Sequence, residues 1–279
     1  MQLNAGSLLE PRWDERRVEI VAWLDHLDPD VVCLQEIWED PATANTAGWL
    51  AEHAATDWHW RFGGLPFPPE LWPRDDLLFG SAILSRWPID DHELLPLPVD
   101  DGADDPFYRL RMELLHVRTA GIDVFSTHLA PPPAQAYHRV RQVRFVDEAI
   151  RARVDPAATL PPILCGDFNS EPESDEMRFL TSTAVIDGRS TYFQDAWKVA
   201  GPDGPGWTQD PATNPIYAAM HLPRKRIDYV LVGDPYGRGG AGVVHRADLA
   251  FHEPRTGTVA SDHFGLVVDV AWPGRPGGR

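Results

Sequence analysis

Residues 163–169 read Ile-Leu-Cys-Gly-Asp-Phe-Asn, a short apolar run that ends in a polar turn. The run has the length and composition of a buried β-strand, and the glycine marks the point where that strand would end. An Asp and an Asn this close together usually cap their own turn, so the motif alone indicates only a strand with polar side chains at its end. Its meaning depends on what the rest of the chain brings to the same place.

Polar side chains stand at the ends of several other predicted strands. They are Asn4, Gln35-Glu36, Thr127-His128, Arg226-Ile227-Asp228-Tyr229 and Ser261-Asp262-His263. Taken singly, a Glu at a strand end is usually solvated and a lone His is usually a satisfied structural residue. Taken together, carboxylates, amides and histidines at the rim of a buried sheet are typical of a functional site.

Short apolar runs, separated by prolines and turns, predict many short elements. Helical periodicity predicts helices over Trp13–Leu27, Tyr137–Arg153 and Glu173–Leu180. Apolar or alternating runs predict strands over Val31–Leu34, Ser81–Ser85, Arg109–Val117, Ile122–Ser126, Ile163–Cys165, Ile227–Val232 and Phe264–Val270. Long loops are predicted over Phe62–Asp76 and Gly201–Pro223. The mixed order, with no visible linker, predicts a single α/β (α+β) sandwich domain over residues 1–279.

Negative charge is the strongest feature of the composition. The chain has 42 acidic and 25 basic residues, a net charge of −17. A nucleic acid would be repelled unless basic residues clustered, and no Lys/Arg-rich tract is visible. Arg139, Arg141, Arg144, Arg151 and Arg153 share one predicted helix, and we expect them to form a solvated helix face.

The two cysteines and the N-terminal residues indicate the cellular compartment of the protein. Cys33 and Cys165 sit inside apolar runs, and we expect them to be buried and reduced. The first ten residues lack the basic and apolar regions of a secretory signal, and no run is long enough to cross a membrane. The sequence therefore predicts a cytoplasmic protein without a membrane span, and it leaves the oligomeric state open.

The polar clusters, in their order along the chain, resemble those of the endonuclease/exonuclease/phosphatase (DNase I-like) superfamily of metal-dependent phosphoesterases. Gly166–Asn169 and Ser261–His263 are the specific motifs, and Arg226–Tyr229 lies between them. The resemblance covers nearly the whole chain. It implies a four-layer α/β sandwich, in which two packed mixed sheets carry helices on their outer sides and the site lies where strand ends from both sheets meet.

The resemblance also implies a metal site. Glu36 corresponds to the principal Mg²⁺ ligand, with Asn4 and Asp262 close to the same ion, and Mn²⁺ is a possible substitute. These residue types suit Mg²⁺, which prefers hard oxygen ligands and usually takes one or two carboxylates together with substrate phosphate. Only Met1, Gln2 and Leu3 precede Asn4, so the first strand is predicted to be either short or cut at its start.

The catalytic roles follow from the same resemblance. Asp167 orients or deprotonates the attacking water, and Asn169 holds water or a phosphoryl oxygen. His263 contacts the phosphate, with Asp228 hydrogen-bonded to its other ring nitrogen, an arrangement that fixes the tautomer and raises the basicity of the imidazole. His128 is expected to be a second histidine on the phosphate. Whether His263 acts as base, acid or electrostatic clamp stays open.

Substrate binding is less strongly signalled. We predict that Arg109 or Arg111 clamps a phosphate oxygen, and we also place Asn214 among the substrate-binding residues. Residues Phe62–Trp72 offer aromatic side chains that could stack a base, grip an acyl chain or simply pack on the core.

The sequence therefore predicts a Mg²⁺-dependent phosphoesterase that uses in-line attack of water, with a phosphodiester favoured over a monoester. One alternative is a DNase I-like endonuclease or exonuclease that acts on nucleic acid. Another is a catalytically silent binding module with the same fold, although a scaffold has no reason to keep the full set of site residues. The net charge and the lack of a basic tract favour a small or neutral-tailed diester as substrate.

Overall fold

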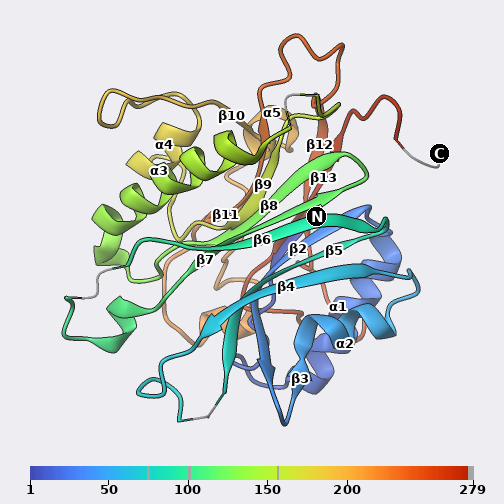
Figure 1. Cartoon of the computed structure of the whole chain (residues 1–279). Coiled ribbons are helices and arrows are strands. Elements are labelled where there is room, and N and C mark those ends of the chain that lie inside the picture. The colour runs from blue at the N-terminus through green and yellow to red at the C-terminus, as the bar shows by residue number, and fades with distance from the viewer. Residues whose placement is uncertain (74–75, 100–101, 156, 276–279) are drawn as a thin grey trace.

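Two mixed β-sheets pack face to face, and helices cover the outer side of each sheet (Figure 1). The computed structural model describes residues 1–73, 76–99, 102–155 and 157–275. Within these residues the layers follow the order helix, sheet, sheet, helix, which confirms the predicted four-layer α/β sandwich.

The first sheet has the strand order β12-β13-β1-β2-β5-β4, with β3 paired to β2. Its strands are β1 (Gln2–Asn4), β2 (Val31–Asp40), β3 (Ala44–Asn45), β4 (His59–Pro66), β5 (Leu78–Ser85), β12 (Val244–Ala250) and β13 (Gly265–Val270). The second sheet has the order β10-β11-β9-β8-β7-β6. Its strands are β6 (Ile89–Pro96), β7 (Glu113–Thr119), β8 (Ile122–His128), β9 (Ile163–Asp167), β10 (Phe193–Asp195) and β11 (Asp228–Gly233).

Helices bury one face against each sheet. The helices are α1 (Trp13–Leu27), α2 (Thr46–His53), α3 (Ala136–Arg153), α4 (Asp175–Leu180), α5 (Ala196–Ala200) and α6 (Pro215–Ala218). Figure 1 shows α1 and α2 outside the first sheet and α3 and α4 outside the second. Leu24 of α1 packs in one core with Leu34 of β2, and Val146 of α3 shares another core with Phe125 of β8.

A third core fills the space between the sheets. Alternation along β2 produces it, because Val32 and Leu34 belong to the core under α1 while Cys33 belongs to the core between the sheets. Gln35 also faces inward, since its side chain bonds to Ser126 of the second sheet. The space between the sheets thus changes from apolar to polar toward the carboxyl end of β2.

Strand direction brings the predicted polar ends to one edge of the sandwich. β1 and β2 are parallel, with Asn4 beside Gln35, and β8 and β9 are parallel, with His128 beside Asp167. β11 is antiparallel to β9 and begins with Asp228 beside Asp167. This edge, which we name the catalytic edge because it carries the predicted catalytic residues, therefore receives residues from both sheets.

Most predicted elements are confirmed, and several strands run further than predicted. The predicted strand Arg109–Val117 is wrong in its first half. Pro106–Arg109 forms a 3₁₀ turn, in which the side chain of Asp105 accepts a 2.9 Å hydrogen bond from the backbone of Phe107. Pairing begins only at Glu113, because its partner on β6 is the last residue of that strand, Pro96.

The two predicted loops contain regular structure. Residues 59–66, which include the start of the predicted loop Phe62–Asp76, form β4, and the later loop Gly201–Pro223 contains α6. Residues 74 and 75 of the first loop lie outside the described residues. Among the helices of the described ranges, none is long and apolar enough to cross a bilayer.

Candidate active site

Asp167, Asp228 and His263 form the centre of the catalytic edge. One side-chain ligand atom from each lies within 4.8 Å of the others, and all three residues are buried. Nδ1 of His263 lies 2.8 Å from Oδ2 of Asp228, and its Nε2 lies 3.8 Å from Oδ2 of Asp167. The structure thus brings together the predicted Asp–His pair and the predicted water-orienting carboxylate.

Asn4 connects this centre with the predicted metal ligand. Its Nδ2 donates hydrogen bonds to Oε1 of Glu36 at 2.9 Å and to Oδ2 of Asp167 at 3.1 Å. Its Oδ1 accepts a bond from the backbone N–H of Gly6 at 3.1 Å. In this orientation Asn4 holds the two carboxylates in place, and its role as a metal ligand stays a prediction.

A bulge in β2 turns Glu36 toward the catalytic edge. The register between β2 and β5 shifts between Leu34 and Ile37, and Glu36 has a φ of 55°, a left-handed conformation that costs a non-glycine residue about 1 kcal/mol or more. Burial first, and then the negative charge of Asp262, raise the pKa of Glu36 to about 8, against the hydrogen bond from Asn4. A cation between these carboxylates would relieve the repulsion that raises this pKa.

Asp262 and His263 are held by the turn that precedes β13. Oδ2 of Asp262 lies 3.6 Å from Nε2 of His263, and its Oδ1 accepts a 3.2 Å hydrogen bond from Ser261. Asn214 donates a 2.8 Å bond to the carbonyl of Ser261, while its Oδ1 caps the first turn of α6. Asn214 therefore positions the turn beside Asp262, and a direct contact with substrate stays a prediction.

The two histidines differ in charge. Burial opposes the charged form of His263, but the carboxylates of Asp228 and Asp262 outweigh it and raise its pKa well above the usual range. His128 lies with Nε2 3.5 Å from Oδ2 of Asp167, and burial, followed by the charge of His263, lowers its pKa to about 3. The carboxylates around His263 thus favour its charged form, while burial favours the neutral form of His128.

Asp167 and Asn169 share the turn after β9. The backbone N–H of Asn169 donates to Oδ1 of Asp167 at 2.8 Å, and the Asn169 side chain donates to the carbonyl of Leu129 at 3.0 Å. Burial and the charge of Asp228 raise the pKa of Asp167 to about 7. A carboxyl with a pKa near neutrality can both hold and release a proton at working pH.

Three glutamines support the site; the sequence marks Gln35 as a polar strand end but gives no role to Gln2 or Gln209. Nε2 of Gln2 donates to Oδ1 of Asp228 and to Oε1 of Gln35, both at 2.8 Å, and Gln35 donates to Ser126 at 2.9 Å. Gln209 lies 2.8 Å from Nε2 of His263. For Gln2 and Gln35 the available signal is a polar residue beside apolar neighbours, because a buried amide must find hydrogen-bond partners, whereas Gln209 stands between Thr208 and Asp210 and offers no such signal.

The predicted basic residues lie around the site rather than in its centre. Leu114 pairs with Thr127, so the chain that leads into β7 reaches the edge that carries His128. Arg109 there is half-buried and Arg111 is exposed, and their phosphate contacts stay predictions. Arg226 makes a bidentate ion pair with Asp195, at 3.0 and 2.7 Å.

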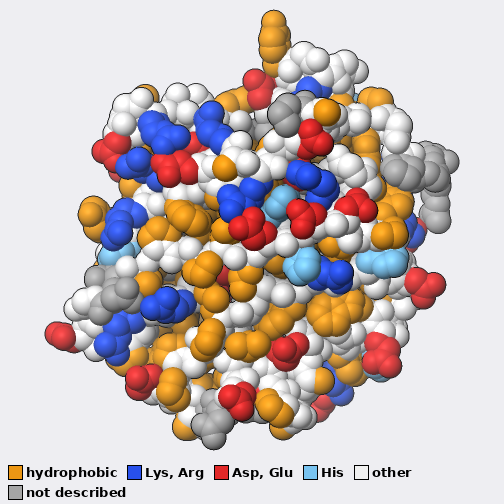
Figure 2. Space-filling model, viewed as in Figure 1, with side chains coloured by type: hydrophobic (Ala, Val, Ile, Leu, Met, Phe, Trp, Pro, Cys, Tyr) orange, Lys and Arg blue, Asp and Glu red, His pale blue; other side chains and the backbone are white. Residues whose placement is uncertain are grey.

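The expected solvated arginine face of α3 is wrong for Arg139. This side chain is buried and donates to Glu176 at 3.1 Å and to the carbonyl of Pro132 at 2.8 Å, so it ties α3 to α4. Arg144 and Arg153 pair with Asp187 and Glu93, respectively. On the face shown in Figure 2, blue basic and red acidic side chains are interleaved rather than separated.

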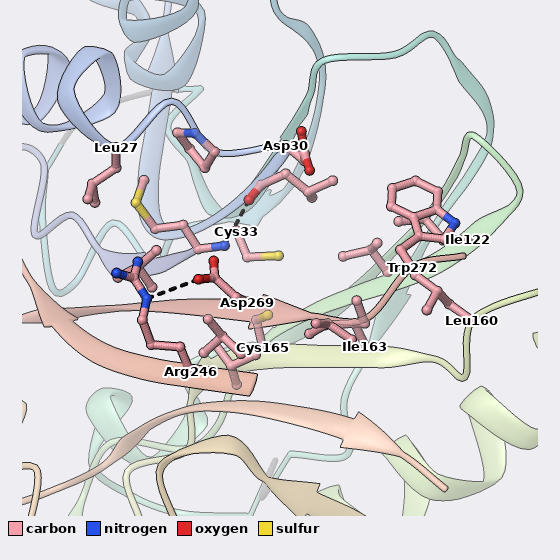
Figure 3. A pocket seen from close by; sticks show the side chains of 18 of the residues that line it. Leu27, Asp30, Cys33, Ile122, Leu160, Ile163, Cys165, Arg246, Asp269 and Trp272 are labelled. Atoms are coloured by element: carbon pink, nitrogen blue, oxygen red, sulfur yellow. Dashed lines mark hydrogen bonds and ion pairs between the residues drawn. The ribbon is translucent and has the colours of Figure 1, made fainter. Parts of the chain in front are cut away.

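A separate cavity of about 530 Å³ opens between the sheets at the edge opposite to the site. Figure 3 shows Cys33 and Cys165 in it, with Trp272 near its rim and an ion pair between Arg246 and Asp269. Both cysteines are buried, free thiols. Because this cavity lies beneath the polar layer of Gln35 and Ser126, it is no part of the catalytic edge.

A family model described as the Endonuclease/Exonuclease/phosphatase family matches residues 1–263. The chain belongs to this family. The match runs from the first strand through His263, so it includes every polar cluster of the catalytic edge.

Relatives of this endonuclease/exonuclease/phosphatase protein include Protein angel homolog 1 from Homo sapiens, 27% identical over 209 residues. That alignment covers 68% of this chain and 28% of the human protein, so the chain spans less than a third of the length of the curated relatives that it matches.

Two solved structures share the fold. An endonuclease/exonuclease/phosphatase from Beutenbergia cavernae DSM 12333 is 25% identical, with a TM-score of 0.67 over 96% of this chain and 70% of that chain. D. rerio TDP2, solved in complex with a single-strand DNA product, is 21% identical, with a TM-score of 0.67 over 96% of both chains.

Proposed function

We propose that this protein hydrolyses a phosphodiester with the help of a bound Mg²⁺ ion. The observation that carries the proposal is the buried arrangement in which Asn4 joins Glu36 to Asp167 while Asp228 holds His263. A purely structural role would not require several ionisable groups to be buried at one edge, because burial of each carboxyl costs free energy.

The donor set at this edge suits Mg²⁺. Glu36 and Asp262 provide carboxylate oxygens, and their mutual repulsion is part of what raises the pKa of Glu36 to about 8. Asp228 is a weaker candidate ligand, since its two oxygens already face Gln2 and His263. We assign the ion to Glu36 and Asp262, with Asn4 beside it. Mg²⁺ bound there supplies polarisation of a phosphoryl oxygen and stabilises charge on the leaving oxygen.

The side chains around the proposed ion have separate roles in proton transfer and in charge stabilisation. Asp167, with a pKa of about 7, accepts the proton of the attacking water, which Asn169 helps to orient. The carboxylates of Asp228 and Asp262 raise the pKa of His263, and in its charged form it stabilises the negative charge that grows on the phosphoryl group. Neutral His128 offers the same phosphoryl group a hydrogen bond without adding charge.

A hydrolysis assay tests this function. We expect the purified protein to cleave bis(p-nitrophenyl) phosphate with Mg²⁺ or Mn²⁺ and to stop when EDTA removes the metal. Asp167→Ala and His263→Ala should each lower kcat by about 10²-fold or more. Asp175→Ala, at the exposed start of α4, is the matched control and should keep full activity. Equal rates in the wild type and both site variants would reject the proposal.

Single-stranded DNA belongs in the same screen, because one structural neighbour was solved with such a product. Degradation of an oligonucleotide at a rate above that of the small diester would favour the nuclease alternative. Absence of both cleavage and Mg²⁺ binding, measured by calorimetry, would favour the silent binding module.

A further inference from the structure

A second hollow adjoins the catalytic edge. This groove, of about 610 Å³, lies between the loop that follows β1, helix α6 and the loop that precedes β13. Most of its lining is apolar. The apolar residues that matter here are Leu9, Pro11, Ile216, Met220, Pro254 and Val259. These three segments also carry or adjoin Asn4, Asn214 and Asp262, so the groove and the candidate active site share parts of the chain.

The groove begins directly beside Asp262. Glu10 lines it, and a Cβ atom on Gly6 would lie 2.5 Å from Cγ of Glu10 and 3.3 Å from Oδ1 of Asp262, so these two acidic side chains are neighbours. The opposite wall is fixed to the same place, because Asn214 at the start of α6 bonds to the carbonyl of Ser261. The groove is therefore within reach of a substituent on a phosphate held by a metal ion at Asp262.

The cations in the groove are already engaged. Of the described lining residues, only Arg12 and Arg16 carry positive charge. Arg16 is buried and donates to backbone carbonyls, among them Ala5 and Ala260 at 2.9 Å. Arg12 pairs with Glu15. The groove thus offers a second phosphate only Arg12, whose charge the neighbouring Glu15 offsets, while Glu10 adds an acidic group at its inner end.

We propose that this groove binds an uncharged hydrocarbon group of the phosphodiester substrate while the phosphate lies at the catalytic edge. The inference rests on the proposed function and narrows it to small diesters with an apolar substituent. A polynucleotide would place its next phosphates against Glu10 and the engaged arginines, without gaining the charge pairs that such a ligand needs.

A series of alkylphosphonates tests the groove without relying on turnover. Binding of methyl-, butyl- and octylphosphonate is measured by calorimetry in the presence of Mg²⁺. Complete burial of one methylene strengthens binding about fourfold. In a half-open groove we expect octylphosphonate to bind at least tenfold more tightly than methylphosphonate.

Two exposed residues on opposite walls serve as test positions. Leu9 and Met220 are 40% and 41% exposed, so Leu9→Asp and Met220→Asp should leave the fold intact. We expect each to reduce the octyl-to-methyl affinity ratio at least threefold. Leu222, equally exposed at 44% and outside the groove lining, provides the matched control, and Leu222→Asp should keep the wild-type ratio.

The outcomes separate the two proposals. Equal affinities for the short and long phosphonates would overturn the proposed role of the groove, even if bis(p-nitrophenyl) phosphate is cleaved. An octyl-to-methyl affinity ratio that stays at the wild-type value in both groove variants would overturn it as well. If no phosphate ester is cleaved and phosphonate affinity is the same with and without Mg²⁺, both the proposed function and the proposed role of the groove are wrong.

Discussion

Gln2 of β1 donates a 2.8 Å hydrogen bond to Oδ1 of Asp228, the first residue of β11 on the opposite sheet. The other oxygen of Asp228 faces Nδ1 of His263, also at 2.8 Å. Both carboxylate oxygens are thereby fixed, and the orientation of the His263 ring follows from them. The buried amide of Gln2 thus sets the orientation of the Asp228 carboxylate and, through it, of the His263 ring.

Gln2→Leu should lower both stability and turnover. The substitution leaves the oxygens of Asp228 and Gln35 without their shared donor, which costs about 1–3 kcal/mol of the free energy of unfolding. We also expect kcat for bis(p-nitrophenyl) phosphate to fall about tenfold, because the Asp228 carboxylate can then rotate away from His263. Urea denaturation and steady-state kinetics measure the two effects.

Gln194→Leu separates stability from catalysis. Gln194 is also buried, and its amide donates to the carbonyls of Gly233 and Gly242, away from the catalytic edge. This variant should lose a similar amount of stability and keep its kcat. A full wild-type kcat in Gln2→Leu would show that Asp228 needs no such support.

Asp228→Asn should lower the pKa of His263. Burial alone depresses the pKa of an imidazole, and Asp228 is the largest of the charges that raise it in His263. Without this carboxylate the ring loses its proton at a lower pH, so less of the enzyme carries the imidazolium at pH 7. We expect kcat to fall about 10²–10⁴-fold. Titration of His263 by NMR checks the direction of the shift, and an unchanged pKa would contradict this account.

The sequence predicted the parts of the site that sit at strand ends. Asp167 and His263 lie in short polar motifs next to apolar runs, and such motifs are visible without a structure. The supporting contacts of Gln2, Gln35 and Gln209 are not predictable from local sequence, because they depend on partners in the other sheet or in a distant loop. Contacts between the two sheets join residues far apart in the sequence, so local sequence patterns do not predict them.

The errors in the fold have similar causes. The predicted strand Arg109–Val117 has the alternating pattern of a strand, but Arg109 lies in a 3₁₀ turn and the ladder with β6 begins only at Glu113. Arg139 was assigned to a solvated helix face, yet its partner Glu176 comes from α4. In both cases the local sequence pattern is as described, but contacts with a neighbouring element determine where the strand begins and whether the side chain is buried.

Glu113 should make stability fall as pH rises. Burial between the sheets raises its pKa to about 8, while the 2.7 Å hydrogen bond from Ser81 works in the opposite direction. The folded protein therefore keeps a proton that the unfolded chain releases near pH 4.5. The stabilisation is complete below pH 4.5 and is lost as pH rises through about 8.

Comparison with Glu113→Gln isolates this effect. Between pH 5 and pH 9 the free energy of unfolding of the wild type should fall, relative to this variant, by on the order of 4 kcal/mol. Urea denaturation at both pH values gives the difference. Glu52→Gln, on the exposed side of α2, should track the wild type at every pH. A wild type and Glu113→Gln with parallel pH profiles would rule out a protonated Glu113.

Glu36 should make Mg²⁺ binding depend on pH. Burial and the charge of Asp262 raise its pKa to about 8, so most of the carboxyl is protonated at pH 6 and must lose its proton before it can hold a cation. Mg²⁺ affinity should therefore rise up to about tenfold per pH unit below 8 and level off above it. Calorimetric titrations at pH 6, 7, 8 and 9 measure the slope.

Glu36→Gln removes the titrating group and keeps the shape of the side chain. We expect weaker Mg²⁺ binding at every pH and a flatter dependence on pH, together with the loss of the rise in melting temperature that Mg²⁺ gives the wild type. Glu52→Gln again serves as the control, since it changes the net charge equally without touching the site. If Glu36→Gln binds Mg²⁺ with the wild-type affinity and slope, the ion is held elsewhere, and Asp167 with Asp228 becomes the place to look because those carboxylates and His263 already converge.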